Sequence, residues 1–125
     1  MTLDAHTVAV AVRQVVRGER PWTDLRALGM KLFPDEGRAE DIRPLDVTAD
    51  VHDLARGFLT HWKDPRALKQ WAFVMEALPT DFQVERHSAG EAVMDLLWDA
   101  SFGHAPDKAG IKLLEELAQE NPSPS

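Results

Sequence analysis

Residues 51–78 read VHDLARGFLTHWKDPRALKQWAFVMEAL, and this stretch decides the fold. Its apolar residues recur every three or four positions on either side of the Asp64-Pro65 pair. That spacing is the period of an amphipathic helix. Asp64 is a typical N-cap residue, and Pro65 suits the first position of a helix. So short a connection predicts an αα-hairpin of two helices, at about 49–62 and 65–78, packed side by side.

The C-terminal half continues the helical pattern. Ser88 and Glu91 form a capping-box pattern, in which each side chain accepts a bond from an exposed backbone amide of the other residue. Residues 93–100 are apolar around most of the helical circumference, which predicts a central helix buried on nearly all sides. A last helix is expected from about Pro106, and residues 121–125 are expected to form a disordered tail.

The N-terminal third admits two interpretations. Residues 8–16 carry a valine stripe at the helical period that ends at Gly18, yet the alternation of valine and alanine also fits a strand. The alanines and the lack of an obvious hairpin partner favour a helix. A second, short helix is expected after Pro21, with Leu32 among its inward residues and Pro34 ending it.

Together these signals predict an all-α protein, a single-domain bundle of five to six helices over residues 1–120. A length of 125 residues fits one domain. The expected core is formed by Phe58, Leu59, Leu68, Trp71, Leu96, Leu97 and Trp98. The four tryptophans, at 22, 62, 71 and 98, are all expected to pack in the core.

Composition excludes several kinds of chemistry. The chain has no cysteine, so it can form neither a disulfide nor a thiolate site. It begins Met-Thr-Leu-Asp without a basic leader and has no apolar run of about 18 residues, from which we expect a cytoplasmic protein that does not enter the membrane.

The net charge of −7 is unevenly distributed along the chain. Residues 35–53 hold seven acidic and two basic side chains, and residues 76–125 hold ten acidic and three basic ones. Such a chain repels nucleic acid and favours a basic protein partner. Moderate acidity also serves solubility alone, and this simpler interpretation stays open.

Two groups of carboxylates are candidates for contact with a basic partner. Glu91, Asp95 and Asp99 follow one another at intervals of four, so they stack along one face of a helix. Like charges at this spacing destabilise a helix by about 0.2–0.5 kcal/mol per pair. Either a basic partner docks on the row, or an Arg or Lys of the same chain pairs with it. The second group is the central acidic segment, Asp35, Glu36, Glu40 and Asp41.

The histidines do not combine into a metal motif in the sequence. His87 and Glu91 are four residues apart, but Glu91 is assigned to the helix cap. His52 and Asp53 are adjacent and therefore point in different directions on a helix. His61 lies at a helix end, where an imidazolium suits the helix dipole. We expect no three ligands to converge, and so predict no metal site and no cofactor.

No catalytic motif is present. The chain lacks a Gly-rich phosphate loop and a nucleophile elbow, so no catalytic residue is predicted. Ser101, Asp99 and His104 contain the elements of a triad, but three groups this close in sequence rarely reach triad geometry. An enzyme with a pocket between helices and a structural subunit of a homo-oligomer both remain alternatives to a binding protein.

One stretch resembles a family. Residues 54–65, LARGFLTHWKDP, followed by Leu68 and Trp71-Ala72, look like a pattern in small bacterial proteins. Some of these proteins resemble immunity proteins of polymorphic toxin systems, which are helical and acidic, as colicin-type immunity proteins often are. The resemblance implies a small binding protein that occludes a basic toxin or nuclease, and it transfers no functional residue. The usage, rich in alanine and arginine, is typical of a GC-rich bacterial genome.

Overall fold

The structure, a computed structural model, describes residues 5–28, 31–33, 38–40, 49–77 and 82–120. The helices in these ranges are α1 (Ala5–Val16), α2 (Thr23–Ala27), α3 (Val51–His61), α4 (Pro65–Ala77), α5 (Gly90–Ser101) and α6 (Lys108–Gln119). Two three-residue strands, β1 (Lys31–Phe33) and β2 (Arg38–Glu40), and one 3-10 turn, η2 (Val84–Arg86), complete the order. The predicted all-α helical class is confirmed, with this short strand pair as its one addition among the described residues.

The α3–α4 hairpin forms as predicted. Asp64 Oδ1 accepts hydrogen bonds from the backbone amides of Arg66 and Ala67, at 3.2 and 3.3 Å. The side chain of Asp64 therefore caps α4, as its place before Pro65 indicated. The two helices are only part of a larger arrangement, because α3 packs most extensively against α6, and α4 against α5.

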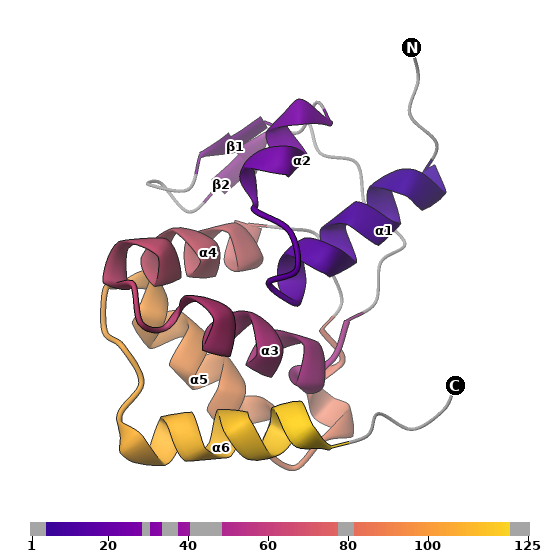
Figure 1. The fold of residues 1–125 in the computed structure, drawn as a ribbon. Helices are drawn as coiled ribbons and strands as arrows, with labels where there is room; N and C mark the ends of the chain where they lie inside the picture. The colour runs from indigo at the N-terminus through magenta and orange to yellow at the C-terminus, as the bar shows by residue number, and fades with distance from the viewer. Residues whose placement is uncertain (1–4, 29–30, 34–37, 41–48, 78–81, 121–125) are drawn as a thin grey trace.

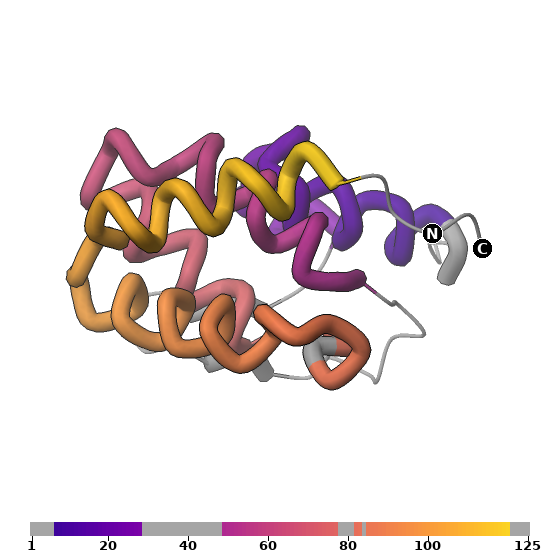
Figure 2. The backbone as a smooth tube through the Cα atoms, turned by 90° about the horizontal axis from the view of Figure 1, so that it is seen from below, coloured from indigo at the N-terminus to yellow at the C-terminus, as the bar shows by residue number. Residues whose placement is uncertain are grey.

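Figures 1 and 2 show this arrangement from two sides. In Figure 1, α6 runs beneath α3, and in Figure 2, seen from below, α6 lies across the same helix. The 3-10 turn η2 contacts α5, and α1 contacts α3. One cluster of buried apolar side chains connects these elements, and it draws on α1 through α6. None of the helices among the described residues is long and apolar enough to cross a lipid bilayer.

Helix α1 resolves the ambiguity of the valine-rich segment in favour of a helix. It is followed by Gly18, whose φ of +76° is typical of a glycine that ends a helix. The end of α1 is fastened to the hairpin because the Trp71 indole N–H donates to the Val15 carbonyl at 3.2 Å. Gly57 of α3 allows this close approach, since a Cβ there would overlap the Val16 carbonyl oxygen and the Trp71 ring.

The second helix is shorter than predicted. It covers only Thr23–Ala27, and Leu32 lies in β1 instead of on its inward face. The strands β1 and β2 pair antiparallel, with Leu32 opposite Ala39, and lie above α4 in Figure 1. The expectation that Leu32 belongs to this helix is therefore wrong. Gly29, a poor helix former, separates α2 from β1 in the sequence.

The N-cap of α5 also differs from its prediction. Its N-cap residue is Ala89, which makes no side-chain cap bond, and Ser88 is exposed. The acceptor at the start of α5 is instead His87, whose Nδ1 accepts a hydrogen bond from the Ala89 amide at 3.0 Å. The predicted Ser88–Glu91 capping box is wrong, because a neighbouring imidazole takes over part of its role.

Helix α5 is buried on one side only. Val93, Leu97 and Ala100 are fully buried, whereas the side chain of Trp98 is 59% exposed. The expectation that α5 is buried on nearly all sides is therefore wrong, and so is the assignment of Trp98 to the core. Of the remaining predicted core residues, Phe58, Leu68, Trp71 and Leu97 are buried, and Leu59 and Leu96 are half-buried. Trp22 and Trp62 are also half-buried, at the edge of the core.

Candidate functional site

The exposed side of α5 brings acidic and aromatic side chains together. We call Glu91, Asp95, Trp98, Asp99 and Phe102 the α5 face. At 3.6 residues per turn, these five positions fall within roughly a third of the helical circumference. Trp98 and Phe102 are 59% and 60% exposed, and their rings meet edge to face at a centroid distance of 5.2 Å. Two large aromatic rings thus lie in solvent beside the three predicted carboxylates, which are all exposed.

The structure describes no basic side chain paired with the three carboxylates of the α5 face. Within the described ranges, no ion pair involves Glu91, Asp95 or Asp99. The intramolecular alternative for this row therefore has no support among these residues. A shallow hollow of about 370 Å³ opens beside Glu91, lined partly by Met94 and Ser88.

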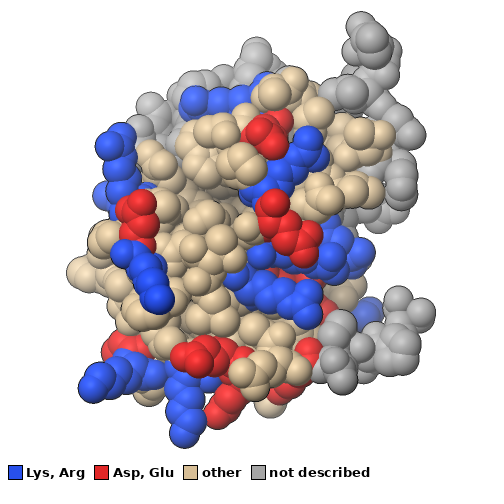
Figure 3. All heavy atoms as spheres, in the orientation of Figure 1, with Lys and Arg blue, Asp and Glu red and all other residues tan. Residues whose placement is uncertain are grey.

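Acidity does not extend over the whole molecule. On the face shown in Figure 3, basic and acidic side chains are mixed along the lower edge, over α6. That helix carries both Lys112 and Glu115 in its sequence KAGIKLLEELAQ. In the second predicted acidic group, Glu40 is the last residue of β2, and Asp35, Glu36 and Asp41 lie outside the described residues.

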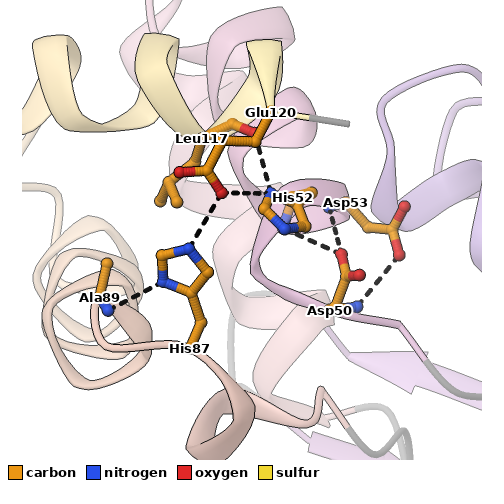
Figure 4. Close-up of polar contacts among 7 residues, drawn as sticks. All are labelled: Asp50, His52, Asp53, His87, Ala89, Leu117 and Glu120. Atoms are coloured by element: carbon orange, nitrogen blue, oxygen red, sulfur yellow. Dashed lines mark hydrogen bonds and ion pairs between the residues drawn. The ribbon is translucent and has the colours of Figure 1, made fainter. Parts of the chain in front are cut away.

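A second constellation joins three segments that are distant in sequence. His52 lies in the first turn of α3, His87 lies between η2 and α5, and Glu120 is the C-cap residue of α6. Figure 4 shows the three side chains pointing toward one another. Among the described residues, they form a group whose possible ligand atoms all lie within 4.8 Å of one another. The expectation that no three ligands converge is therefore wrong.

The hydrogen bonds of this group indicate which ring nitrogen of each neutral histidine carries the proton. His87 Nδ1 accepts the Ala89 amide, so in the neutral ring the proton is on Nε2, which lies 3.0 Å from Glu120 Oε2. His52 Nδ1 lies 2.9 Å from the Leu117 carbonyl oxygen and 3.5 Å from Glu120 Oε2. Both of these neighbours are acceptors, so the His52 proton belongs on Nδ1 and its Nε2 retains a lone pair.

The group borders a pocket of about 300 Å³. Asp50 and Arg86 also line it. Asp50 is committed to α3, where its Oδ1 accepts the amides of His52 and Asp53 in a capping box. Chemically, two imidazoles and one carboxylate around such a pocket are suited to a divalent transition metal or to proton exchange.

His61, the histidine placed at a helix end, is in a different environment. Its ring packs against that of Trp71 at a centroid distance of 5.7 Å. Burial lowers the pKa of His61, against the attraction of the nearby Asp64 carboxylate, which raises it. The neutral form is therefore favoured, contrary to the imidazolium expected from the helix dipole.

The serine of the weak triad is occupied elsewhere. Ser101 is buried, and its hydroxyl donates to the Trp98 carbonyl oxygen at 2.6 Å. Asp99 and His104 are both exposed, and the bond between them joins the His104 amide to the Asp99 carbonyl oxygen. Ser101 thus serves to hold the last turn of α5.

Comparison of the chain with protein-family models, with curated proteins and with solved structures finds no match. The α5 face and the group of His52, His87 and Glu120 are thus the two candidate sites that the described residues form.

Proposed function

We propose that the protein is a cytoplasmic protein-binding module whose α5 face docks a basic partner. The observation that carries this proposal is the exposure of Trp98 and Phe102 among three carboxylates that no basic side chain of the described residues neutralises. Neither ring is needed for the core, because Leu97 and Ala100 cover the buried side of the helix.

The aromatic pair would supply the affinity of such an interface. Tryptophan is enriched among the residues that dominate binding energy, particularly when it enters a pocket from which water is excluded. Trp98 and Phe102 already contact each other edge to face, so the pair loses little side-chain freedom on binding. A partner with an apolar pocket would therefore bury a preformed anchor.

The carboxylates would supply the choice of partner and the speed of association. A row of like charges beside an apolar anchor attracts a basic surface and accelerates its approach at low salt. It also disfavours a second copy of this chain, because a symmetric dimer through the α5 face would place Asp95 and Asp99 near their own equivalents.

The partner class that fits best is a basic protein such as a toxin or nuclease of a bacterial toxin–immunity pair. Its phosphate-binding lysines and arginines would be occluded by Glu91, Asp95 and Asp99, while Trp98 anchors the complex. The resemblance of residues 54–72 to immunity-type proteins supports this reading, and so does the acidic C-terminal part of the chain.

The test uses the full chain as bait in an extract of its native host. Proteins retained by the wild type are compared with those retained by Trp98→Ala, by Asp95→Asn with Asp99→Asn, and by a control, Glu115→Gln on α6. We expect a basic protein that the control retains and that Trp98→Ala loses. With the purified partner, the double variant should bind more weakly and with a flatter dependence on salt.

Two results would contradict the proposal. One is a partner that Trp98→Ala and the double variant retain as well as the wild type does. The other is self-association abolished by Trp98→Ala, measured by light scattering, because it would make the α5 face a contact between copies of this chain.

A further inference from the structure

We propose that His52, His87 and Glu120 form a binding site for a divalent transition metal ion of the zinc type. The site does not depend on the proposed protein-binding function, although its His87 and Glu91 of the α5 face line the same hollow. It would join the start of α3, the turn before α5 and the end of α6. These three segments are distant in the sequence, and no sequence motif links them.

The donor set is appropriate to such an ion. Two imidazoles and one carboxylate are the three protein ligands of several open zinc sites, in which water fills the remaining position. The pocket of about 300 Å³ beside the three side chains gives room for that water. Imidazole nitrogen favours zinc and its neighbours in the first transition row over magnesium and calcium, which prefer oxygen ligands.

The spacing of the ligand atoms is also appropriate. A tetrahedral ion with bonds of about 2.0–2.2 Å separates its ligand atoms by about 3.3–3.6 Å. His87 Nε2 and Glu120 Oε2 are 3.0 Å apart, and all three ligand atoms lie within 4.8 Å of one another. Small side-chain rotations bring the group to coordination distance. The Glu120 side chain, which is 46% exposed, has the most room for this adjustment.

The ring of His52 is held beside Glu120 by its contact with α6. Its Nδ1, the ring nitrogen that lies 3.5 Å from Glu120 Oε2, donates its proton to the Leu117 carbonyl oxygen at 2.9 Å. Because Leu117 is buried in α6, this orientation follows from the packing of α6 on α3. Coordination through Nδ1 therefore moves this proton to Nε2 and leaves the Leu117 carbonyl without this donor.

His87 must change its tautomer when the ion binds. Without metal, its proton is on Nε2 and points to Glu120, while Nδ1 accepts the Ala89 amide. Coordination through Nε2 moves this proton to Nδ1, so the neutral ring keeps one proton and the Ala89 amide loses its acceptor. Zinc binding therefore has a signature at the start of α5 that no structural role of these residues would produce.

The experiment is a titration of the metal-stripped full chain with zinc, followed by calorimetry and by the melting temperature. We expect one zinc per chain and a higher melting temperature with zinc, reversed by chelator. Glu120→Gln and His87→Gln should each weaken binding at least about tenfold. The control His104→Gln, at an exposed histidine after α5, should bind as the wild type does.

Nuclear magnetic resonance supplies a second measurement that does not depend on the variants folding. The ring nitrogens of wild-type His87 should report Nε2–H without zinc and Nδ1–H with it, and exchange of the Ala89 amide should accelerate. Absence of saturable binding at about 1 mM zinc, well above any specific affinity of such sites, would overturn the proposal. Unchanged binding by both ligand variants, or an unchanged His87 tautomer in the zinc-bound protein, would overturn it equally.

Discussion

Arg17 Nε lies 2.6 Å from Asp53 Oδ1, and this ion pair joins the end of α1 to the first turn of α3. The Asp53 side chain is 8% exposed and that of Arg17 is 30% exposed. The hydrogen bond to Asp53 raises the pKa of the Arg17 guanidinium, so this side chain stays positively charged. Asp53 Oδ2 also accepts the Asp50 amide at 3.0 Å and so completes the capping box of α3. One carboxylate therefore holds both a helix end and a contact between helices.

Replacing Asp53 with asparagine should lower the free energy of unfolding by about 1–3 kcal/mol. Breaking a fully buried ion pair costs more than this, but Arg17 is partly exposed, so water replaces some of the lost interaction. Urea denaturation measures the change. The matched control is Asp24→Asn, which removes the exposed pair of Asp24 with Arg20, four residues before it, and should cost less than about 1 kcal/mol. Equal losses for both variants would contradict the role given to Asp53.

Replacing Gly57 with alanine should destabilise the protein although alanine is the better helix former. The gain in helix propensity is about 1 kcal/mol, whereas overpacking costs about 1–3 kcal/mol or more. Here the new Cβ meets a backbone oxygen of Val16 and the buried ring of Trp71, neither of which can move easily. Thermal melting of Gly57→Ala measures the change, with Gly110→Ala as the control. At Gly110 the nearest atom to a new Cβ is a side-chain methyl of Leu96 at 3.1 Å, which can move aside more easily than backbone. A Gly57→Ala protein as stable as Gly110→Ala would show that α1 does not lie this close to α3.

Leu97→Ala should cost about 2–5 kcal/mol, because Leu97 is fully buried and its loss leaves a cavity. Its neighbour Trp98 is the control. Trp98→Ala removes a larger side chain, yet one that is mostly exposed, so it should cost less than Leu97→Ala. Chemical denaturation of the two variants compares them directly, and the opposite order would mean that α5 is rotated about its axis from the described position.

The local signals of the sequence predicted most of the helices. The α3–α4 hairpin follows from the helical period and from Asp64-Pro65, whose cap is present in the structure. The structure adds a cap at the start of α3, where the Asp50 side chain accepts the amides of His52 and Asp53. Such a cap is readable in principle, since Asp50 and Asp53 have the spacing of a capping box with aspartate in the second place.

The exposure of Trp98 could not be predicted in the same way. A tryptophan in an apolar run is usually buried, and only the packing of α5 against α4 decides which side of the helix is covered. The group of His52, His87 and Glu120 likewise depends on how the helices pack, which the sequence pattern does not give. Its members are separated by more than thirty residues at each step, and they meet because α6 lies along α3. The period of the apolar residues shows which face of each helix is apolar, but it does not show which helices pack against each other.

The stability of the protein should fall on acidification in a way that depends on His61. Burial lowers the pKa of His61 in the folded protein below its ordinary value of 6.5. The unfolded chain therefore takes up the proton first, so the unfolding free energy falls as pH drops through about 6.5 and levels off below the folded pKa. Unfolding measured between about pH 8 and pH 5 should show a smaller decline for His61→Gln than for the wild type. Parallel profiles for wild type and His61→Gln would contradict the burial of this ring.

The acidic row of the α5 face makes a prediction that needs no partner. Asp95→Asn combined with Asp99→Asn keeps the shape of both side chains and removes two like charges four residues apart. Since no ion pair among the described residues involves either carboxylate, relief of their repulsion should leave the isolated protein as stable as the wild type, or more stable by about 0.2–0.5 kcal/mol. A thermal melt at low and at high salt measures this, and the difference from wild type should shrink as salt screens the repulsion. If the double variant were instead less stable by several kcal/mol, a basic side chain of the same chain would have to pair with the row, and the row would then serve the fold and not a partner.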